Sequence, residues 1–147
     1  MPNPIYLVSA CLAGQKCRYD GRANTHPLCQ ALVQQGLAVP ICPECDGGLP
    51  IPRDPAERQG DLIVTCRGRD VTQAYHRGAL AALETAQRLG ITRAILKAKS
   101  PSCGSSLIYD GTFQRRLISG EGVTCSLLRR NGIQVCSELE LDCPPWG

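Results

Sequence analysis

Residues 5–10 have the sequence IYLVSA, and Cys11 follows them directly. A short apolar run with β-branched and aromatic side chains predicts a buried β-strand. Comparable runs predict strands at residues 37–42, 92–96 and 133–136. Strands that are apolar along their whole length are typical of a parallel sheet covered on both faces. The first strand therefore predicts a sheet at the centre of the molecule.

Helical segments separate these strands. Residues 25–35 have apolar side chains on one helical face, with a proline in the first turn and Gly36 after the last. A long helix is predicted at residues 70–89, with Asp70 as its cap, and a short one at residues 123–130. Strands and helices that alternate along a chain predict an α/β fold with a mainly parallel sheet flanked by helices.

Length and composition match one ordinary domain. The chain has 147 residues, of which 43% are hydrophobic and 20% charged, so we expect residues 1–147 to form a single domain with its own core. A proline-rich loop precedes a further apolar run at residues 62–65, which predicts another strand. Residues 99–120 are rich in serine and glycine and are expected to be mostly loop.

Charge and hydropathy exclude several classes of protein. The formal net charge of +3 is too small to indicate nucleic acid or an anionic membrane as a partner. No apolar run approaches the length that spans a bilayer, and the N-terminus lacks the pattern of a secretory signal. We therefore expect a cytoplasmic protein that has neither a membrane nor a nucleic acid as its partner.

The chain has ten cysteines and two histidines. In a reducing compartment, clustered cysteines indicate metal binding or catalysis more often than disulfides. With so few histidines, a metal site would depend on thiolates, which favour zinc, copper(I) or iron–sulfur groups. We expect His76 in the long helix to be structural. We also expect four cysteines to be ordinary buried residues: Cys29, Cys66, Cys125 and Cys136.

Three other cysteines lie where predicted strands end. Cys11 follows the first strand, Cys42 ends the second, and Cys103 lies in the loop after residues 92–96. Right-handed crossovers place the loops after parallel strands along one edge of the sheet, where such folds build their sites. These three cysteines can therefore converge at one edge.

Residues with useful chemistry surround these cysteines. Cys42 and Cys45 form a C-x₂-C pair, half of a zinc or iron–sulfur site, and Glu44 between them is placed for proton transfer. The loop at residues 97–105 can present amides and hydroxyls to a ligand, and its lysines would lower a thiol pKa; the alternative is a solvated turn. Residues 120–122 are placed to bind an anion at a helix N-terminus.

Six motifs follow one another along nearly the whole chain. They are VSACLAG at residues 8–14, RYDG at 18–21, CPE at 42–44, GGLP at 47–50, SPSCGS at 100–105 and IYDGTF at 108–113. Together they resemble the motifs of the thiouracil desulfidase (TudS) family. The resemblance implies a compact Rossmann-like domain with a [4Fe–4S] cluster at the carboxyl edge of its strands.

The resemblance also implies roles for individual residues. The cluster ligands would be Cys11, Cys42 and Cys103, with the fourth iron open to the sulfur of the substrate. Glu44 matches the acid/base carboxylate of the family. The catalytic serine would be Ser100 or Ser102; we assign catalysis to Ser100 and substrate binding to Ser102. Two further cysteines stand where relatives commonly have aliphatic or alanine residues, and we do not expect them to be ligands: Cys45 and Cys125.

The function implied by the resemblance is non-redox removal of sulfur from a small thiolated pyrimidine. The substrate would be 4-thiouracil or 2-thiouracil, or the corresponding nucleoside or nucleotide, and the products uracil and sulfide. Two alternatives remain open from the residues themselves. One is a zinc-stabilised binding module, and the other is a thiol redox or sulfur-transfer protein that uses Cys42 and Cys45.

Overall fold

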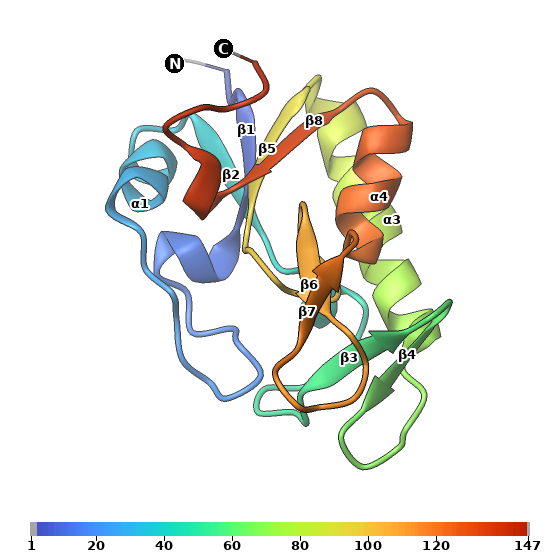
Figure 1. The fold of residues 1–147 in the computed structure, drawn as a ribbon. Coiled ribbons are helices and arrows are strands. Elements are labelled where there is room, and N and C mark those ends of the chain that lie inside the picture. The colour runs from blue at the N-terminus through green and yellow to red at the C-terminus, as the bar shows by residue number, and fades with distance from the viewer. Residues whose placement is uncertain (1–2, 147) are drawn as a thin grey trace.

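The computed structural model describes residues 3–146 and is built around a four-stranded sheet (Figure 1). The strands are β1 (Tyr6–Ser9), β2 (Ala38–Ile41), β5 (Arg93–Leu96) and β8 (Gln134–Ser137). They lie in the order β2-β1-β5-β8, and every neighbouring pair is parallel. The predicted α/β class and parallel sheet are thereby confirmed, and each strand begins one residue later than the apolar pattern indicates.

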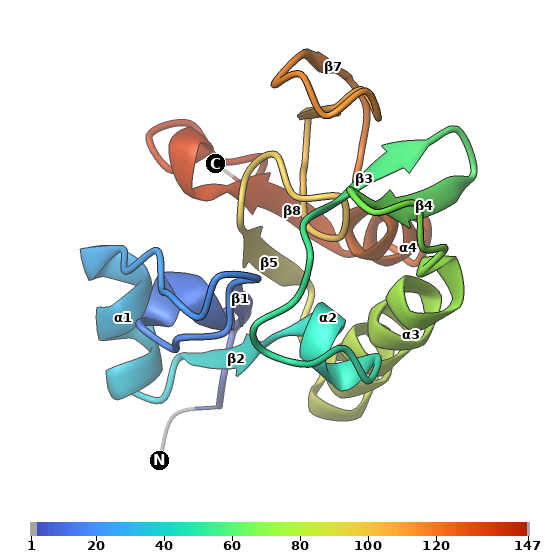
Figure 2. The same cartoon turned by 90° about the horizontal axis from the view of Figure 1, so that it is seen from below.

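Helices cover both faces of the sheet (Figure 2). Helix α1 (Pro27–Gln34) lies on one face, and α3 (Thr72–Leu89) and α4 (Val123–Arg130) lie together on the other. The sequence prediction for α4 is confirmed to the residue. Asp70 stands one residue before the cap position of α3, where its carboxylate accepts a hydrogen bond from the amide of Thr72 at 2.9 Å. No helix within residues 3–146 is long and apolar enough to cross a membrane.

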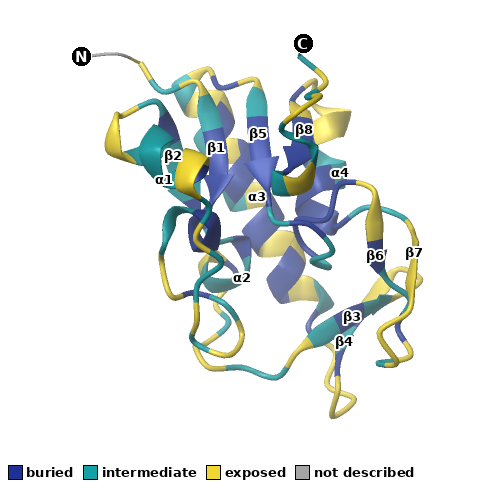
Figure 3. Cartoon of the chain, turned by 60° about the vertical axis from the view of Figure 1, so that its left-hand side comes forward, coloured by how far each residue is buried: buried dark blue, intermediate teal, exposed yellow. Residues whose placement is uncertain are grey.

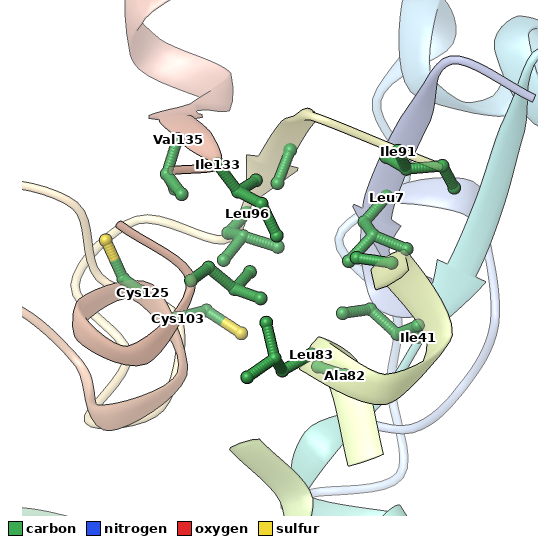
Figure 4. Close-up of a cluster of buried hydrophobic side chains, with 13 residues drawn as sticks. Leu7, Ile41, Ala82, Leu83, Ile91, Leu96, Cys103, Cys125, Ile133 and Val135 are labelled. Atoms are coloured by element: carbon green, nitrogen blue, oxygen red, sulfur yellow. The ribbon is translucent and has the colours of Figure 1, made fainter. Parts of the chain in front are cut away.

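Alternate residues of the central strands enter two different cores. Leu7 and Leu96 point toward α3 and α4, where they pack with Leu83 and the side chain of Cys103 (Figure 4). Val8 and Ile95 point to the opposite face and pack with residues of α1. Because strand side chains alternate between the two faces, apolar residues at every position are what a sheet covered on both sides requires.

Two antiparallel hairpins extend beyond the carboxyl edge of the sheet, and many of their residues are exposed (Figure 3). One pairs β3 (Ala56–Gln59) with β4 (Leu62–Thr65), so the strand predicted at residues 62–65 exists but lies outside the parallel sheet. The other pairs β6 (Leu107–Tyr109) with β7 (Leu117–Ser119), within the segment predicted to be loop. Cys66, just after β4, is exposed, so the prediction of its burial was wrong.

Short helices follow three strands of the sheet at this edge. They are the 3₁₀ turn η1 (Ala10–Ala13) after β1, the single turn α2 (Pro43–Asp46) after β2, and the 3₁₀ turn η2 (Glu138–Glu140) after β8. Helix α2 packs directly on α3 through two glycines. A Cβ atom at Gly78 would lie 1.8 Å from the carbonyl oxygen of Pro43, and one at Gly47 would lie 1.9 Å from that of Ala74. The backbone of α2 therefore touches the backbone of α3, with no side chain between them.

A Gly78→Ala substitution should destabilise the fold by about 1–3 kcal/mol, because the added methyl forces α2 and α3 apart. The sign of this change is informative, because a glycine-to-alanine substitution inside a helix without such a contact stabilises the helix by about 1 kcal/mol. Chemical denaturation of the variant would measure the free energy of unfolding. Leu80→Ala, at an exposed position of the same helix, is the matched control. A Gly78→Ala variant as stable as the parent would contradict the close contact.

Candidate functional site

A cavity of about 540 Å³ opens at the carboxyl edge of the sheet. Its wall contains segments that follow β2, β1 and β5, which are the first three strands in the order of the sheet. The wall includes six side chains that are able to bind a metal group or to take part in catalysis: Cys11, Cys17, Cys42, Glu44, Ser100 and Cys103. Segments distant in sequence thus share one cavity because their strands are adjacent and parallel.

The three cysteines predicted to share an edge line this cavity. Cys11 lies in η1, two residues after β1; Cys42 follows β2 and precedes the first turn of α2. Cys103 lies in the loop after β5, and its side chain also contacts the core under α3 and α4 (Figure 4). Cys11 and Cys103 are buried, whereas Cys42 is half-buried. The expectation of a common edge is confirmed.

Two elements hold the Cys103 loop in place. The hydroxyl oxygen of Ser100 accepts hydrogen bonds from the amides of Ser102 and Cys103, each at 3.1 Å. The first amides of α4 are donors as well: Val123 donates to the Pro101 carbonyl at 3.0 Å, and Thr124 to that of Ser102 at 2.8 Å. Residues 120–122, just before α4, were predicted to bind an anion at the N-terminus of this helix. That prediction is wrong, since the loop carbonyls already occupy its first amides.

The two predicted serines have different positions. Ser100 lines the cavity, and two amides already donate to its oxygen, so its hydroxyl hydrogen remains available to donate to a ligand. Ser102 is 0% exposed, and its hydroxyl pairs with that of Thr124 at 2.8 Å. The structure therefore brings Ser100 to the cavity and does not bring Ser102 there.

Glu44 projects from α2 and forms an ion pair with Arg53. The guanidinium donates to Glu44 Oε2 from Nη2 at 2.7 Å and from Nε at 3.0 Å. Tyr75 of α3 also lines the cavity; burial raises the pKa of its phenol, and the negative charge of Glu44 raises it further. The carboxylate is thus bonded to the Arg53 guanidinium, and the Tyr75 phenol lies on the same cavity wall. No sequence motif around Arg53 indicates this role, and neither Arg53 nor Tyr75 was predicted to be a site residue.

Cys17 is a fourth cysteine on the cavity wall that the strand pattern does not reveal, because it lies in a loop. A hydrogen bond from its thiol lowers the pKa of Cys11 and lowers that of Cys42 to about 6. A thiol carries one hydrogen, so Cys17 stabilises one of these thiolates at a time. The pKa of Cys103, in contrast, is raised to about 12 by burial. Lys97 of this loop lowers the pKa of Cys11, so the predicted effect of the loop's lysines on a thiol is found at Cys11 and not at Cys103.

In protein without a bound metal group, Cys42 should react with iodoacetamide at a pH well below that needed by an ordinary thiol. The thiolate is the nucleophile, so the reaction rate should rise as the pH passes through about 6 and then level off. Alkylation mapped by mass spectrometry across a pH series measures the midpoint. Cys17→Ala removes the hydrogen bond and should raise the midpoint. A midpoint near 8.5 in the parent, the ordinary value for cysteine, would contradict the geometry.

The remaining predicted residues lie apart from the cavity or at its margin. His76 is exposed on α3 and is absent from the cavity wall. Cys45 is half-buried on α2, and Nη1 of Arg53 lies 3.8 Å from its sulfur. Cys29, Cys125 and Cys136 are buried in the cores, as predicted.

The cysteines on the cavity wall are the side chains that could hold a metal group. Within residues 3–146, no group of three or more His, Cys, Asp or Glu side chains is arranged to hold a single metal ion. Three cysteine sulfurs from three strand ends nevertheless share one cavity, and thiolates are the ligands of iron–sulfur clusters. The chemistry of these donors fits a cluster, with Cys11, Cys42 and Cys103 as the ligands expected from the resemblance.

The fold and the cavity together define an α/β protein whose sheet edge brings cysteine side chains and an oriented carboxylate to one cavity. A family model described as 2-thiouracil desulfurase matches residues 6–140. The chain belongs to this family. The resemblance inferred from the six motifs is thereby confirmed.

Two relatives cover nearly the whole chain. A solved structure described as the [4Fe-4S]-dependent thiouracil desulfidase TudS (DUF523Vcz) is 50% identical, with a TM-score of 0.90 over 95% of this chain and 93% of that one. A Bacillus subtilis (strain 168) protein, "Uncharacterized protein YbbK", is 44% identical over 148 residues, which is 94% of this chain and 98% of the relative. The fold thus has a counterpart in a solved structure of high sequence identity.

Proposed function

We propose that this protein is a [4Fe–4S]-dependent desulfidase that converts thiouracil and water to uracil and sulfide. The observation that carries the proposal is the meeting of Cys11, Cys42, Cys103 and Glu44 at one cavity, in a member of the 2-thiouracil desulfurase family. The structural neighbour is described as a [4Fe-4S]-dependent thiouracil desulfidase, which supports the same cofactor and reaction. Among the alternatives, neither a zinc module nor a dithiol protein has comparable support.

The chain's own residues supply binding and proton transfer. When bound to the three cysteines, the cluster supplies an iron that acts as a Lewis acid on the carbon–sulfur double bond. Glu44 then takes a proton from a water molecule, which attacks the carbon that bears the sulfur. The oxygen of that water becomes the carbonyl oxygen of uracil, and the sulfur departs as sulfide. The reaction is a hydrolysis and requires no net electron transfer.

Ser100 is the proposed catalytic serine. Its oxygen accepts hydrogen bonds from two loop amides, so the Ser100 hydroxyl would act as a hydrogen-bond donor to a ring nitrogen or oxygen of the substrate. Ser102, buried against Thr124, is proposed to keep the loop in shape and not to bind substrate directly.

Replacing Ser100 by alanine should lower kcat by about 10²-fold, because it removes a donor to the substrate and loosens the Cys103 loop. Rates of sulfide release, compared at matched iron content, separate the two effects. Ser106→Ala, at an exposed position of the same loop, is the matched control and should behave as the parent. Full activity of the Ser100→Ala variant would remove this serine from the mechanism.

The proposed function is tested most directly on protein purified without oxygen. Iron, acid-labile sulfide and the absorption spectrum are measured first, and sulfide release from 4-thiouracil and 2-thiouracil is measured next. About four irons and four sulfides per chain, together with release of sulfide and uracil in equal amounts, are expected. A colourless protein that cannot be reconstituted with iron and sulfide would overturn the cluster. A fully loaded protein that releases no sulfide from either base would overturn the reaction.

We further propose a small-molecule substrate and a cytoplasmic location. A cavity of about 540 Å³ is of the size that encloses one small ligand, and the net charge of +3 does not favour a nucleic acid partner. All ten cysteines are unpaired, which suits a reducing compartment. Retention of activity on free thiouracil without any added RNA is the expected result.

A further inference from the structure

Arg53 lies at the centre of the cavity's hydrogen-bond network, although no motif singles it out. Its side chain is only 7% exposed. Besides the two bonds to Glu44, Nη2 donates to the carbonyl of Cys17 at 2.9 Å, and Nη1 donates to that of Pro50 at 3.2 Å. The backbone amide of Arg53 donates to the carbonyl of Tyr19 at 2.8 Å. One residue thus connects the Cys17 loop, the loop after α2 and the carboxylate.

The contacts with Glu44 are asymmetric. Both Nε and Nη2 donate to Oε2, so Arg53 leaves Oε1 without a guanidinium contact. Two hydrogen bonds to one oxygen restrict rotation of the carboxylate about its last bonds, and they thereby limit where the other oxygen can lie. Helix α2, which carries Glu44, is itself held by the glycine contact with α3. The carboxylate is therefore fixed from its backbone and from its tip.

We propose that Arg53 is a positioning residue that holds Glu44 through Oε2 and so directs Oε1 at the attacking water. This inference rests on the proposed function, because it assigns a part in that reaction. Arg53 touches the carboxylate and not the reacting atoms, so its effect on the reaction passes through Glu44.

The guanidinium is suited to this task in a way that lysine is not. Its planar donors reach Glu44, Cys17 and Pro50 at once, whereas an ammonium group is a point charge on a flexible stem. Burial makes the arrangement rigid, and it also makes the loss of one partner costly, because the other charge stays buried. Arg53→Lys should therefore fail to restore full activity although it keeps the charge.

The experiment compares Arg53→Gln and Arg53→Lys with the parent holoenzyme, with Arg69→Gln at an exposed arginine as control. Iron and labile sulfide per chain are measured with kcat and KM for thiouracil. We expect Arg53→Gln to keep the iron content and KM of the parent and to lose about 10²-fold in kcat. Arg53→Lys should lie between the two, and it also provides a second variant should the glutamine substitution impair folding.

A double-mutant cycle shows whether the effect passes through Glu44. In a Glu44→Gln background, Arg53→Gln should cause no further loss of kcat, because residues that act as a unit are not additive. Additive losses, a parallel fall of iron and kcat, or an unchanged kcat would each overturn the positioning role. A parent that is fully loaded with iron and releases no sulfide overturns the proposed function and this inference together. Sulfide release by the parent with additive losses overturns the Arg53 role alone.

Discussion

A Glu44→Gln variant is expected to keep its iron and labile sulfide and to lose sulfide release by about 10²–10⁴-fold. Glutamine has nearly the shape of glutamate and can still accept a hydrogen bond from Arg53, so α2 and the adjacent Cys42 should stay in place. It cannot accept a proton from water, which is the step assigned to the carboxylate, and a positioned general base contributes a factor of this size. Single-turnover sulfide release at matched iron content is the measurement.

The control for this variant is Glu84→Gln, an exposed position on α3, which should be indistinguishable from the parent. Rates close to the parent's in Glu44→Gln would show that another group activates the water. A fall in iron content alongside the rate would instead show that the substitution damages the Cys42 segment.

Serine in place of Cys11 or Cys103 should deplete the cluster. Loss of a residue that hydrogen-bonds to a metal ligand weakens metal binding by about 10–100-fold, and loss of a ligating thiolate should cost at least as much. At Cys103 the effect has a second origin, because a serine hydroxyl would be buried where the thiol now contacts the core beside Leu83 and Leu96. Iron per chain after anaerobic reconstitution, with the absorption spectrum, measures both variants.

Two matched controls separate ligand loss from general damage. Cys66→Ser changes an exposed thiol and Cys125→Ala changes a fully buried one, and both should retain the iron content of the parent. Cys45→Ser also distinguishes the mechanisms, because a dithiol protein would lose its activity and a desulfidase should not. An intact spectrum in Cys11→Ser or Cys103→Ser would remove that residue from the ligands, and Cys17 would be the next candidate.

The parallel sheet and the common edge were predictable because they depend on local patterns. Apolar runs define β1, β2, β5 and β8, and parallel connections then oblige Cys11, Cys42 and Cys103 to share an edge. Strand β3 escaped prediction because the sequence Ala56–Gln59 is mostly polar and has no alternation. It is a strand because β4 supplies its partner, which is information held outside the segment.

The surroundings of Glu44 were not predictable for a related reason. Arg53 lies in a proline-rich loop, and its partners Cys17 and Glu44 are 36 and 9 residues away in sequence. Only the folded chain shows that they meet. The positions of the two serines were not predictable either: two serines in one short motif look alike, and the contacts of the loop with α4, including the bond between Ser102 and Thr124, decide which one lines the cavity.

The start of α4 has a consequence for how the protein fluctuates. The first amides of an isolated helix lack partners, but here the amides of Val123 and Thr124 are bonded to the loop that carries Cys103. The loop and the first turn of the helix therefore form one cooperative unit, which must open together or not at all. Cys103 cannot swing out of the cavity without fraying α4, so the stability of a helix turn governs how often this thiol is released.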